Sequence, residues 1–349
     1  MTDSTEDTDV ENLIDDFFGD LFDLTGSISA DRNTWSAQNW KSTSALGLPL
    51  VGIDERWGGS GGTLIDTLSV LRGVGRYCVP LPLAETSLAA WLLAQAGVDV
   101  PDGPLTVMVA TDNLVLSGRR LSGDAGSVPW ASEAAAVVGV VDDPDGDSTL
   151  VVASPREFTQ QVTTDLTGVR YSRAVLSDLE VERHPIPLRA DDVFVRGALL
   201  RAALLTGAIE GAFALTSRYV AERSQFGRPI GAFQSVQAHT VALAEASIAA
   251  RLVIEAAAVA TDFGNATFEM LSAKSLVNEH ARTAARASHQ AHGAIGMTQE
   301  YSLHHFTRRL NAWRGEFGDE RTLHSRLGEF AIHARSVLID PTGSEMAGA

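Results

Sequence analysis

The chain has 349 residues, which is too long for one ordinary hydrophobic core and fits two or three packed units. Hydrophobic residues make up 45% and charged residues 20%, and we expect a globular protein with no membrane span. The formal net charge of −17 disfavours nucleic acid as a partner, because like charges repel. An anionic cofactor would therefore need arginines placed next to it.

The first residues and the cysteine content indicate the compartment. The stretch from Met1 to Asp9 is acidic and polar, unlike a signal or transit peptide. The single cysteine, Cys78, cannot form an internal disulfide. We therefore expect a cytoplasmic protein.

The apolar pattern divides the chain into three parts. Helical spacing runs from about Val10 to Gly97, interrupted by a glycine-rich loop over 47–63. Short β-branched runs separated by turns follow, as expected for an antiparallel sheet. These runs are 105–110, 114–116, 135–141, 149–153 and 171–181.

Alanine-rich helical segments return after about Ala190 and predict an antiparallel bundle. They cover 192–222, 234–263, 266–293 and 322–337. The chain is thus predicted to be mainly α with a β middle domain. We place an N-terminal helical domain at 1–102, the β domain at 103–188 and the C-terminal bundle at 189–349.

One segment of the predicted bundle carries chemistry, and it reads RSQFGRPIGAFQSVQ over 223–237. A helix is expected to end near Arg223, with Gly227 as its C-terminal stop and Pro229 preventing continuation. The next helix begins around Gln234. Arg223 and Gln234 then lie on either side of a tight corner, where a guanidinium and an amide can be aimed at a pyrophosphate.

This segment resembles the acyl-CoA dehydrogenase family, in which the corresponding Arg-x-x-Phe-Gly…Gln stretch meets FAD across a dimer interface. A second match is QAHGAIG over 290–296, followed by Tyr301 and Arg308. A third comprises GLPLV at 47–51, WGGSGG at 57–62, GVGR at 73–76 and PLP at 80–82. The matches span nearly the whole chain. The resemblance implies the family fold, with an N-terminal helical domain, a β domain and a C-terminal four-helix bundle.

The resemblance also implies that the chain binds FAD and acts on an acyl-CoA thioester. The expected contacts to the ADP part of FAD are Arg223, Gln225, Phe226, Gln234, Gln290, Gly293 and Ala294. Ala294 replaces a family glycine that lets the backbone approach the cofactor. No metal site is expected, because the histidine pairs lack acidic or cysteine partners at metal-site spacing.

Two departures from the family concern the reacting half of the site. Members usually open the β domain with a Thr-Glu-Pro-x-Ala-Gly-Ser-Asp stretch that contacts the isoalloxazine, and nothing like it occurs between Pro104 and Trp130. The family's catalytic glutamate falls on Phe317, with Glu316 one residue early. The alternative position used by some members falls on Gly197. Neither of the two positions at which family members carry the base therefore holds a glutamate in this sequence.

Three hypotheses remain open. In the first, the chain is one half of a heteromeric α2β2 acyl-CoA dehydrogenase, like the smaller subunits of actinobacterial steroid side-chain degradation. It would contribute the ADP side of the FAD site to a paralogous partner that carries the base, with an electron-transfer flavoprotein-type acceptor. The second is a catalytically silent homologue that binds acyl-CoA or flavin. The third is a self-sufficient dehydrogenase using Glu316, although that side chain could simply be ion-paired at the surface beside Arg314 and Arg321.

Overall fold

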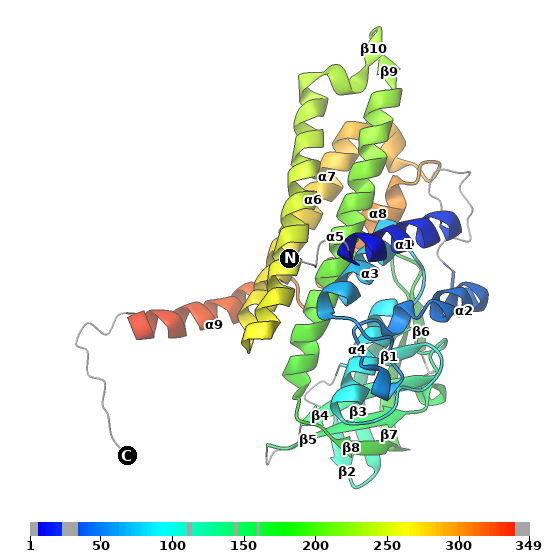
Figure 1. The fold of residues 1–349 in the computed structure, drawn as a ribbon, viewed down its shortest axis with the longest axis vertical. Helices are drawn as coiled ribbons and strands as arrows, with labels where there is room; N and C mark the ends of the chain where they lie inside the picture. The colour runs from blue at the N-terminus through cyan, green and yellow to red at the C-terminus, as the bar shows by residue number, and fades with distance from the viewer. Residues whose placement is uncertain (1–5, 23–33, 110–113, 143–145, 159–160, 339–349) are drawn as a thin grey trace.

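The computed structural model describes residues 6–22, 34–109, 114–142, 146–158 and 161–338. A helical bundle runs along the long axis of the molecule, and the β domain lies beside one end of it (Figure 1). The N-terminal helices pack between the two. The predicted order of helical, β and helical parts is confirmed.

The N-terminal part contains helices α1 (Glu6–Leu21), α2 (Ala37–Ala45), α3 (Leu64–Arg76) and α4 (Leu83–Gln95). The glycine-rich loop contains only the single turns η2 (Leu48–Leu50) and η3 (Glu55–Trp57), as its composition predicts. Helix α3 begins with a capping box, in which the Thr63 and Asp66 side chains each accept from the other's backbone N–H. Ten of the thirteen residues of α4 are buried, so this helix runs through the interior.

The β domain contains two four-stranded sheets, with strand orders β1-β4-β5-β8 and β2-β3-β7-β6. The strands are β1 (Leu105–Val107), β2 (Val115–Ser117), β3 (Arg120–Pro129), β4 (Ala136–Asp142), β5 (Ser148–Ala153), β6 (Gln161–Thr164), β7 (Arg170–Glu180) and β8 (Glu182–Pro185), with the turn η4 (Pro155–Phe158) after β5. The prediction of purely antiparallel pairing is wrong at one place, because β1 and β4 pair in parallel. The chain enters the second sheet through β2 and β3 before it returns to β4, which leaves β1 and β4 in the same direction.

The bundle contains α5 (Ala190–Glu222), α6 (Gln234–Ala260), α7 (Thr267–His292) and α8 (Leu303–Gly315), followed by α9 (Glu320–Leu338), which projects away from it (Figure 1). The short turn η5 (Ile230–Ala232) precedes α6. The turns η6 (Thr261–Phe263) and η7 (Gly293–Met297) follow α6 and α7, respectively. Helix α5 is long and apolar enough to cross a bilayer by length and composition. However, 83% of its apolar window is buried inside the fold, as in the core helix of a bundle.

Glycines on α5 allow α3 to pack against it at very short range. A Cβ added to Gly207 would overlap the carbonyl oxygen of Arg72, and one added to Gly211 would overlap the carbonyl oxygen of Arg76 as well as the Phe306 ring of α8. Arg72 and Arg76 of α3 both pair with Glu210 of α5, next to this crossing. The close approach of α3 and α5 therefore depends on the missing side chains.

We predict that Gly207→Ala destabilises the protein by about 1–3 kcal/mol, the usual cost of overpacking a well-filled interior. The Arg72 carbonyl belongs to a helix and cannot move aside as a flexible side chain would. Gly328→Ala on α9 is the matched control, because nothing lies within 4 Å of its added Cβ, and it should leave stability equal or higher. Urea denaturation of the three proteins measures the difference, and equal midpoints would contradict it.

Candidate functional site

A cavity of about 320 Å³ opens where the three parts of the chain meet. Helices α4 and α5, strands β1, β3 and β7 and the turn between α8 and α9 all contribute to its wall. The lining residues are Ala84, Glu85, Leu88, Val107, Val109, Ser127, Pro129, Tyr171, Phe194, Gly197, Leu200, Arg201 and the four residues 315–318. A mostly apolar cavity with a few convergent polar groups is the usual form of a small-molecule site.

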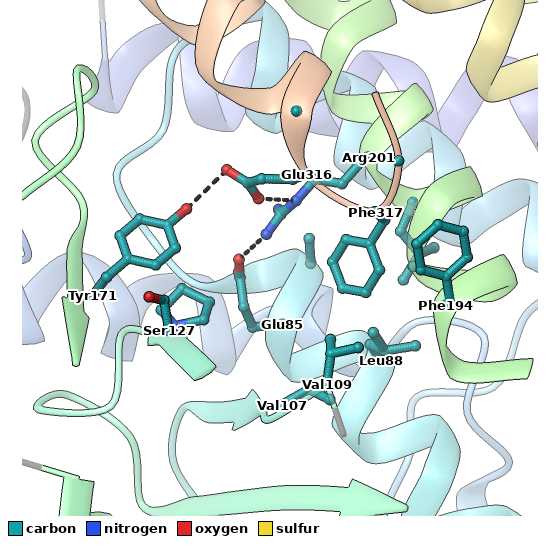
Figure 2. Close-up of a pocket in the computed structure, with 16 residues that line it drawn as sticks. Glu85, Leu88, Val107, Val109, Ser127, Tyr171, Phe194, Arg201, Glu316 and Phe317 are labelled. Carbon is teal, nitrogen blue, oxygen red and sulfur yellow. Dashed lines mark hydrogen bonds and ion pairs between the residues drawn. The ribbon is translucent and has the colours of Figure 1, made fainter. Parts of the chain in front are cut away.

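A buried charge cluster occupies one wall of this cavity (Figure 2). Arg201 Nη2 lies 2.5 Å from Glu85 Oε1, and its Nε lies 2.5 Å from Glu316 Oε2. The Tyr171 hydroxyl donates to Glu316 Oε1 over 2.8 Å. The Arg201 guanidinium of α5 thus pairs with side chains from α4 and the α8–α9 turn, and Tyr171 of β7 is joined to it through Glu316.

Burial and the neighbouring opposite charges shift the pKa values of Glu316 and Arg201 in opposite directions. Burial raises the pKa of Glu316, and Glu85 adds to this effect, while Arg201 and Tyr171 work against it. For Arg201, burial alone would lower the pKa, but Glu316 and Glu85 together outweigh it, and the pKa rises above its usual range. The arginine therefore stays charged and forms an ion pair with Glu316. The expectation that Glu316 might pair at the surface with Arg314 or Arg321 is wrong, because its partner is buried and Arg314 pairs with Glu320.

The two positions expected for a catalytic base lie against each other. A Cβ added to Gly197 would overlap the Phe317 ring, so both positions face the same point of the cavity. The Phe317 ring also packs near Phe194, with ring centroids 6.3 Å apart (Figure 2). An aromatic ring and a glycine fill the place where a carboxylate was sought, and Glu316 points away from it toward Arg201.

Side chains of helix α7 form hydrogen bonds to the backbone of the turn that carries Glu316 and Phe317. Lys274, which is fully buried, donates to the Trp313 carbonyl over 2.9 Å and to Asn278 over 2.8 Å. Asn278 in turn donates to the carbonyls of Arg314 and Gly318. Phe317 has a φ of +50°, which a non-glycine residue adopts only when its surroundings impose it.

The predicted ADP-side residues lie at the other end of the bundle. Helix α5 ends at Glu222, and a two-residue hairpin of β9 (Ser224–Gln225) and β10 (Arg228–Pro229) follows (Figure 1). Gly227 is therefore a hairpin-turn residue and not the helix stop that we expected. It and Phe226 both have positive φ, as a tight turn of this kind requires. Ile230, Val220 and Ala291 form one cluster, which brings the turn after α7 beside the hairpin.

The residues at this end fit the ADP part of FAD. Arg223, Gln225, Gln234 and Gln290 are all exposed, and Arg223 forms no ion pair with any described residue. Gly293 has a φ of +62° and open space around its α-carbon, and Ala294 is exposed next to it. Phe226 is 91% exposed at the hairpin tip. A free guanidinium, several amides and an open backbone turn are suitable donors for a pyrophosphate. The individual contacts remain predictions.

The cavity and the hairpin lie far apart along helix α5. Gly197 and Arg223 are 26 residues apart on or at the end of α5, which corresponds to about 39 Å at roughly 1.5 Å per residue. The cavity and the hairpin are therefore separate regions of this chain.

Four residues were not predicted from the sequence: Glu85, Tyr171 and Arg201, which line the cavity, and Lys274, which supports the turn at its wall. The available signal was a lone charge in an apolar helix, as with Arg201 in GALLRAALL over 197–205. Lys274 is one of only two lysines in the chain and lies in a segment predicted to be helical. Such charges are rarely buried without partners, but the sequence does not name the partners.

The chain is similar in sequence and in fold to known acyl-CoA dehydrogenases. Residues 189–331 match the model for the acyl-CoA dehydrogenase C-terminal domain. The chain is 30% identical over 278 residues to acyl-CoA dehydrogenase IpdE2 of Mycobacterium tuberculosis, covering 76% of this chain and 77% of the relative. The solved Tcur3481-Tcur3483 steroid ACAD (G363A variant) superposes with a TM-score of 0.84 at 24% identity, covering 95% of this chain and 99% of that chain. The ChsE4-ChsE5 complex from M. tuberculosis gives 0.80 at 21%, covering 95% and 98%.

The chain belongs to the acyl-CoA dehydrogenase family. It is thus an FAD-dependent oxidoreductase acting on acyl-CoA, and the predictions of family, fold and cofactor are confirmed. When bound, FAD supplies the hydride acceptor of the reaction.

We predict that Lys274 makes stability depend on pH. Burial lowers its pKa to about 7, more than nearby Glu316 raises it. Between pH 7 and 10.5 the unfolded chain then binds more protons at this residue than the folded chain, so the free energy of unfolding rises with pH. From pH 7.5 to 9.5 this rise should be about 1–3 kcal/mol smaller in Lys274→Met than in the wild type. Lys41→Met, which changes the exposed lysine, should keep the wild-type slope. Equal slopes in all three proteins would contradict the assignment.

Proposed function

We propose that this chain is a subunit of a heteromeric FAD-dependent acyl-CoA dehydrogenase whose catalytic base is supplied by a partner subunit. The complex would desaturate the α,β bond of an acyl-CoA, such as a steroid side-chain CoA ester. This chain contributes the ADP side of the FAD site, and a paralogous partner contributes the base. An electron-transfer flavoprotein-type acceptor would reoxidise the complex.

The observation that carries the proposal is the contact between Phe317 and Gly197. A general base must come within hydrogen-bond reach of the proton that it removes. Both positions considered for that base lack an ionisable group, and the contact between them leaves no room for one. The neighbouring carboxylate of Glu316 is held by Arg201 and Tyr171.

The separation of the two ends of α5 favours a site divided between chains. The hairpin end carries exposed Arg223 and Gln234, which can serve only a flavin whose reacting ring lies in another subunit. One face of α6 also exposes Val241, Ile248, Leu252 and Val259, which recur at helical spacing. An apolar stripe of this kind commonly marks a subunit contact.

The relatives support the heteromeric form of the proposal. Two of the solved structures above are named for pairs of different proteins, and one of them is called a steroid ACAD. In such an assembly Arg223 would hold the pyrophosphate and Gly293 would allow backbone approach to it.

Flavin stoichiometry tests the proposal directly. The full chain purified alone should retain little FAD, whereas the chain co-expressed with a neighbouring dehydrogenase gene product should give a complex with about one FAD per heterodimer. Arg223→Ala in this chain should weaken FAD retention by about 1.5–3 kcal/mol, the usual worth of a hydrogen bond to a charged group. Arg223→Lys should restore only part, since an ammonium lacks the guanidinium fork. A stable homo-oligomer with one FAD per chain would overturn the proposal.

Glu316→Gln separates this proposal from a self-sufficient dehydrogenase. In the assembled complex we expect the rate of dye reduction to change by less than about tenfold, below the usual 10²–10⁴-fold worth of a general base. We expect this small change because Glu316 is paired with Arg201 and so does not serve as the base. Mutation of the partner's glutamate should instead abolish turnover while FAD stays bound. A Glu316→Gln complex that keeps its FAD and loses turnover would make this chain the catalytic one.

A further inference from the structure

Helix α6 forms an outer edge of the bundle and is apolar on two sides (Figure 1). Its inner side is buried against α5 and α7. Its outer side carries Val241, Ile248, Leu252 and Val259, whose side chains are 42–62% exposed. Only three of its 27 residues are glutamates or arginines. A helix that is apolar on both sides is normally covered on both, so we expect another chain to lie against the outer side.

One carboxylate lies within this apolar surface. Because successive residues of a helix are rotated by about 100°, Glu245 is within roughly 60° of Val241, Ile248 and Leu252. Its side chain is exposed, and it forms no ion pair with any residue that the structure describes. We call the five residues together the outer stripe, which comprises Val241, Glu245, Ile248, Leu252 and Val259.

A chain that covers the outer stripe must accommodate the charge of Glu245. An ionised carboxylate enclosed in an apolar contact is costly unless a cation pairs with it. Arg251 cannot serve, because it already pairs with Glu11 and Glu255. His239, the other basic residue of α6, is six positions from Glu245 and lies on a different side of the helix. The cation must therefore come from the covering chain.

A second copy of this chain does not meet that requirement. A two-fold contact between two outer stripes brings the same residues of both copies together. It would enclose two Glu245 carboxylates, and neither α6 helix has a free cation to offer them. Like charges opposed within an interface disfavour the contact. The charge on the outer stripe therefore favours a chain of different sequence.

We propose that the outer stripe binds a paralogous subunit whose facing surface is apolar and places an arginine or lysine opposite Glu245, and that Glu245 disfavours pairing of this chain with itself. The paralogous partner rests on the proposed function. Gln234 lies on the same side of α6, two turns before Val241. A subunit seated on the outer stripe thus lies next to a residue that we expect to contact its flavin.

The first test uses the full chain alone and asks whether Glu245 prevents self-association. In sedimentation velocity over a concentration series, Glu245→Leu should self-associate at least about tenfold more tightly than the wild type, because the two opposed charges are gone. Glu279→Leu is the matched control, since Glu279 is also an exposed glutamate within a helix but lies on α7. This control should self-associate no more than the wild type.

Three results of the first test would overturn the inference. The first is a tight homodimer of the wild type, the second is no gain in Glu245→Leu, and the third is an equal gain in Glu279→Leu.

The second test uses the complex with the co-expressed partner and follows its dissociation on dilution by mass photometry. Glu245→Lys should weaken the complex at least about tenfold, because it opposes the cation of the partner. Glu245→Leu should also weaken it, since that cation then lacks its carboxylate, whereas a purely apolar contact would be strengthened by the added leucine. Glu245→Asp should retain most of the affinity, and Glu279→Lys should change nothing.

A complex that is unchanged or tighter in Glu245→Leu or Glu245→Lys would show that no cation faces this position and would overturn the inference. The wild-type complex and its flavin stoichiometry are unaffected by that result, so the proposed function is judged separately.

Discussion

The buried guanidinium of Arg201 is the interaction on which the cavity depends. An isolated buried charge is so costly that it persists only with partners, and those partners must come from whatever segments surround it. Here they are Glu85 from the N-terminal part and Glu316 from the turn after α8, with Tyr171 of the β domain joined through Glu316. One charge on α5 thereby fixes the relative positions of the three parts of the chain. Removal of one partner of such a cluster typically costs about 3–5 kcal/mol.

The same pairing underlies our proposal that Glu316, beside the family's base position, does not act as the base. A carboxylate that pairs with a buried arginine loses that interaction when it takes a proton. The turn is also fixed from the other side by Lys274 and Asn278, so Glu316 cannot turn toward Gly197 without breaking bonds on both sides of the turn. Phe317 then points to Gly197 as a consequence of the backbone conformation, with its positive φ.

Much of this arrangement was predictable from the sequence, and the limits have physical causes. The long helices of the bundle were found because their apolar spacing is regular over many turns. Helix α8 was missed because its sequence LHHFTRRLNAWRG is mostly basic and polar, although its apolar residues are buried. Strand β3 was missed because Gly123 and Gly126 interrupt its alternation at shifts of register. The position of Phe317 could be assigned, but the partner of Glu316 lies 115 residues away, and no local pattern carries that pairing.

Under the proposed function, the two ends of α5 would allow a subunit to lose one role and keep another. The helix is 33 residues long, so its ends are held by different neighbours and share no side-chain contact. Substitutions around Gly197 change the reacting cavity without touching the hairpin at Arg223, because the bundle between them is closely packed and stays fixed. In an assembly where each flavin is held by two chains, loss of a base in one chain removes only the site that contains that base. The hairpin of the same chain would remain under selection for the flavin of its partner. The proposed ADP-binding end and the blocked base position are therefore compatible within one subunit of a divided enzyme.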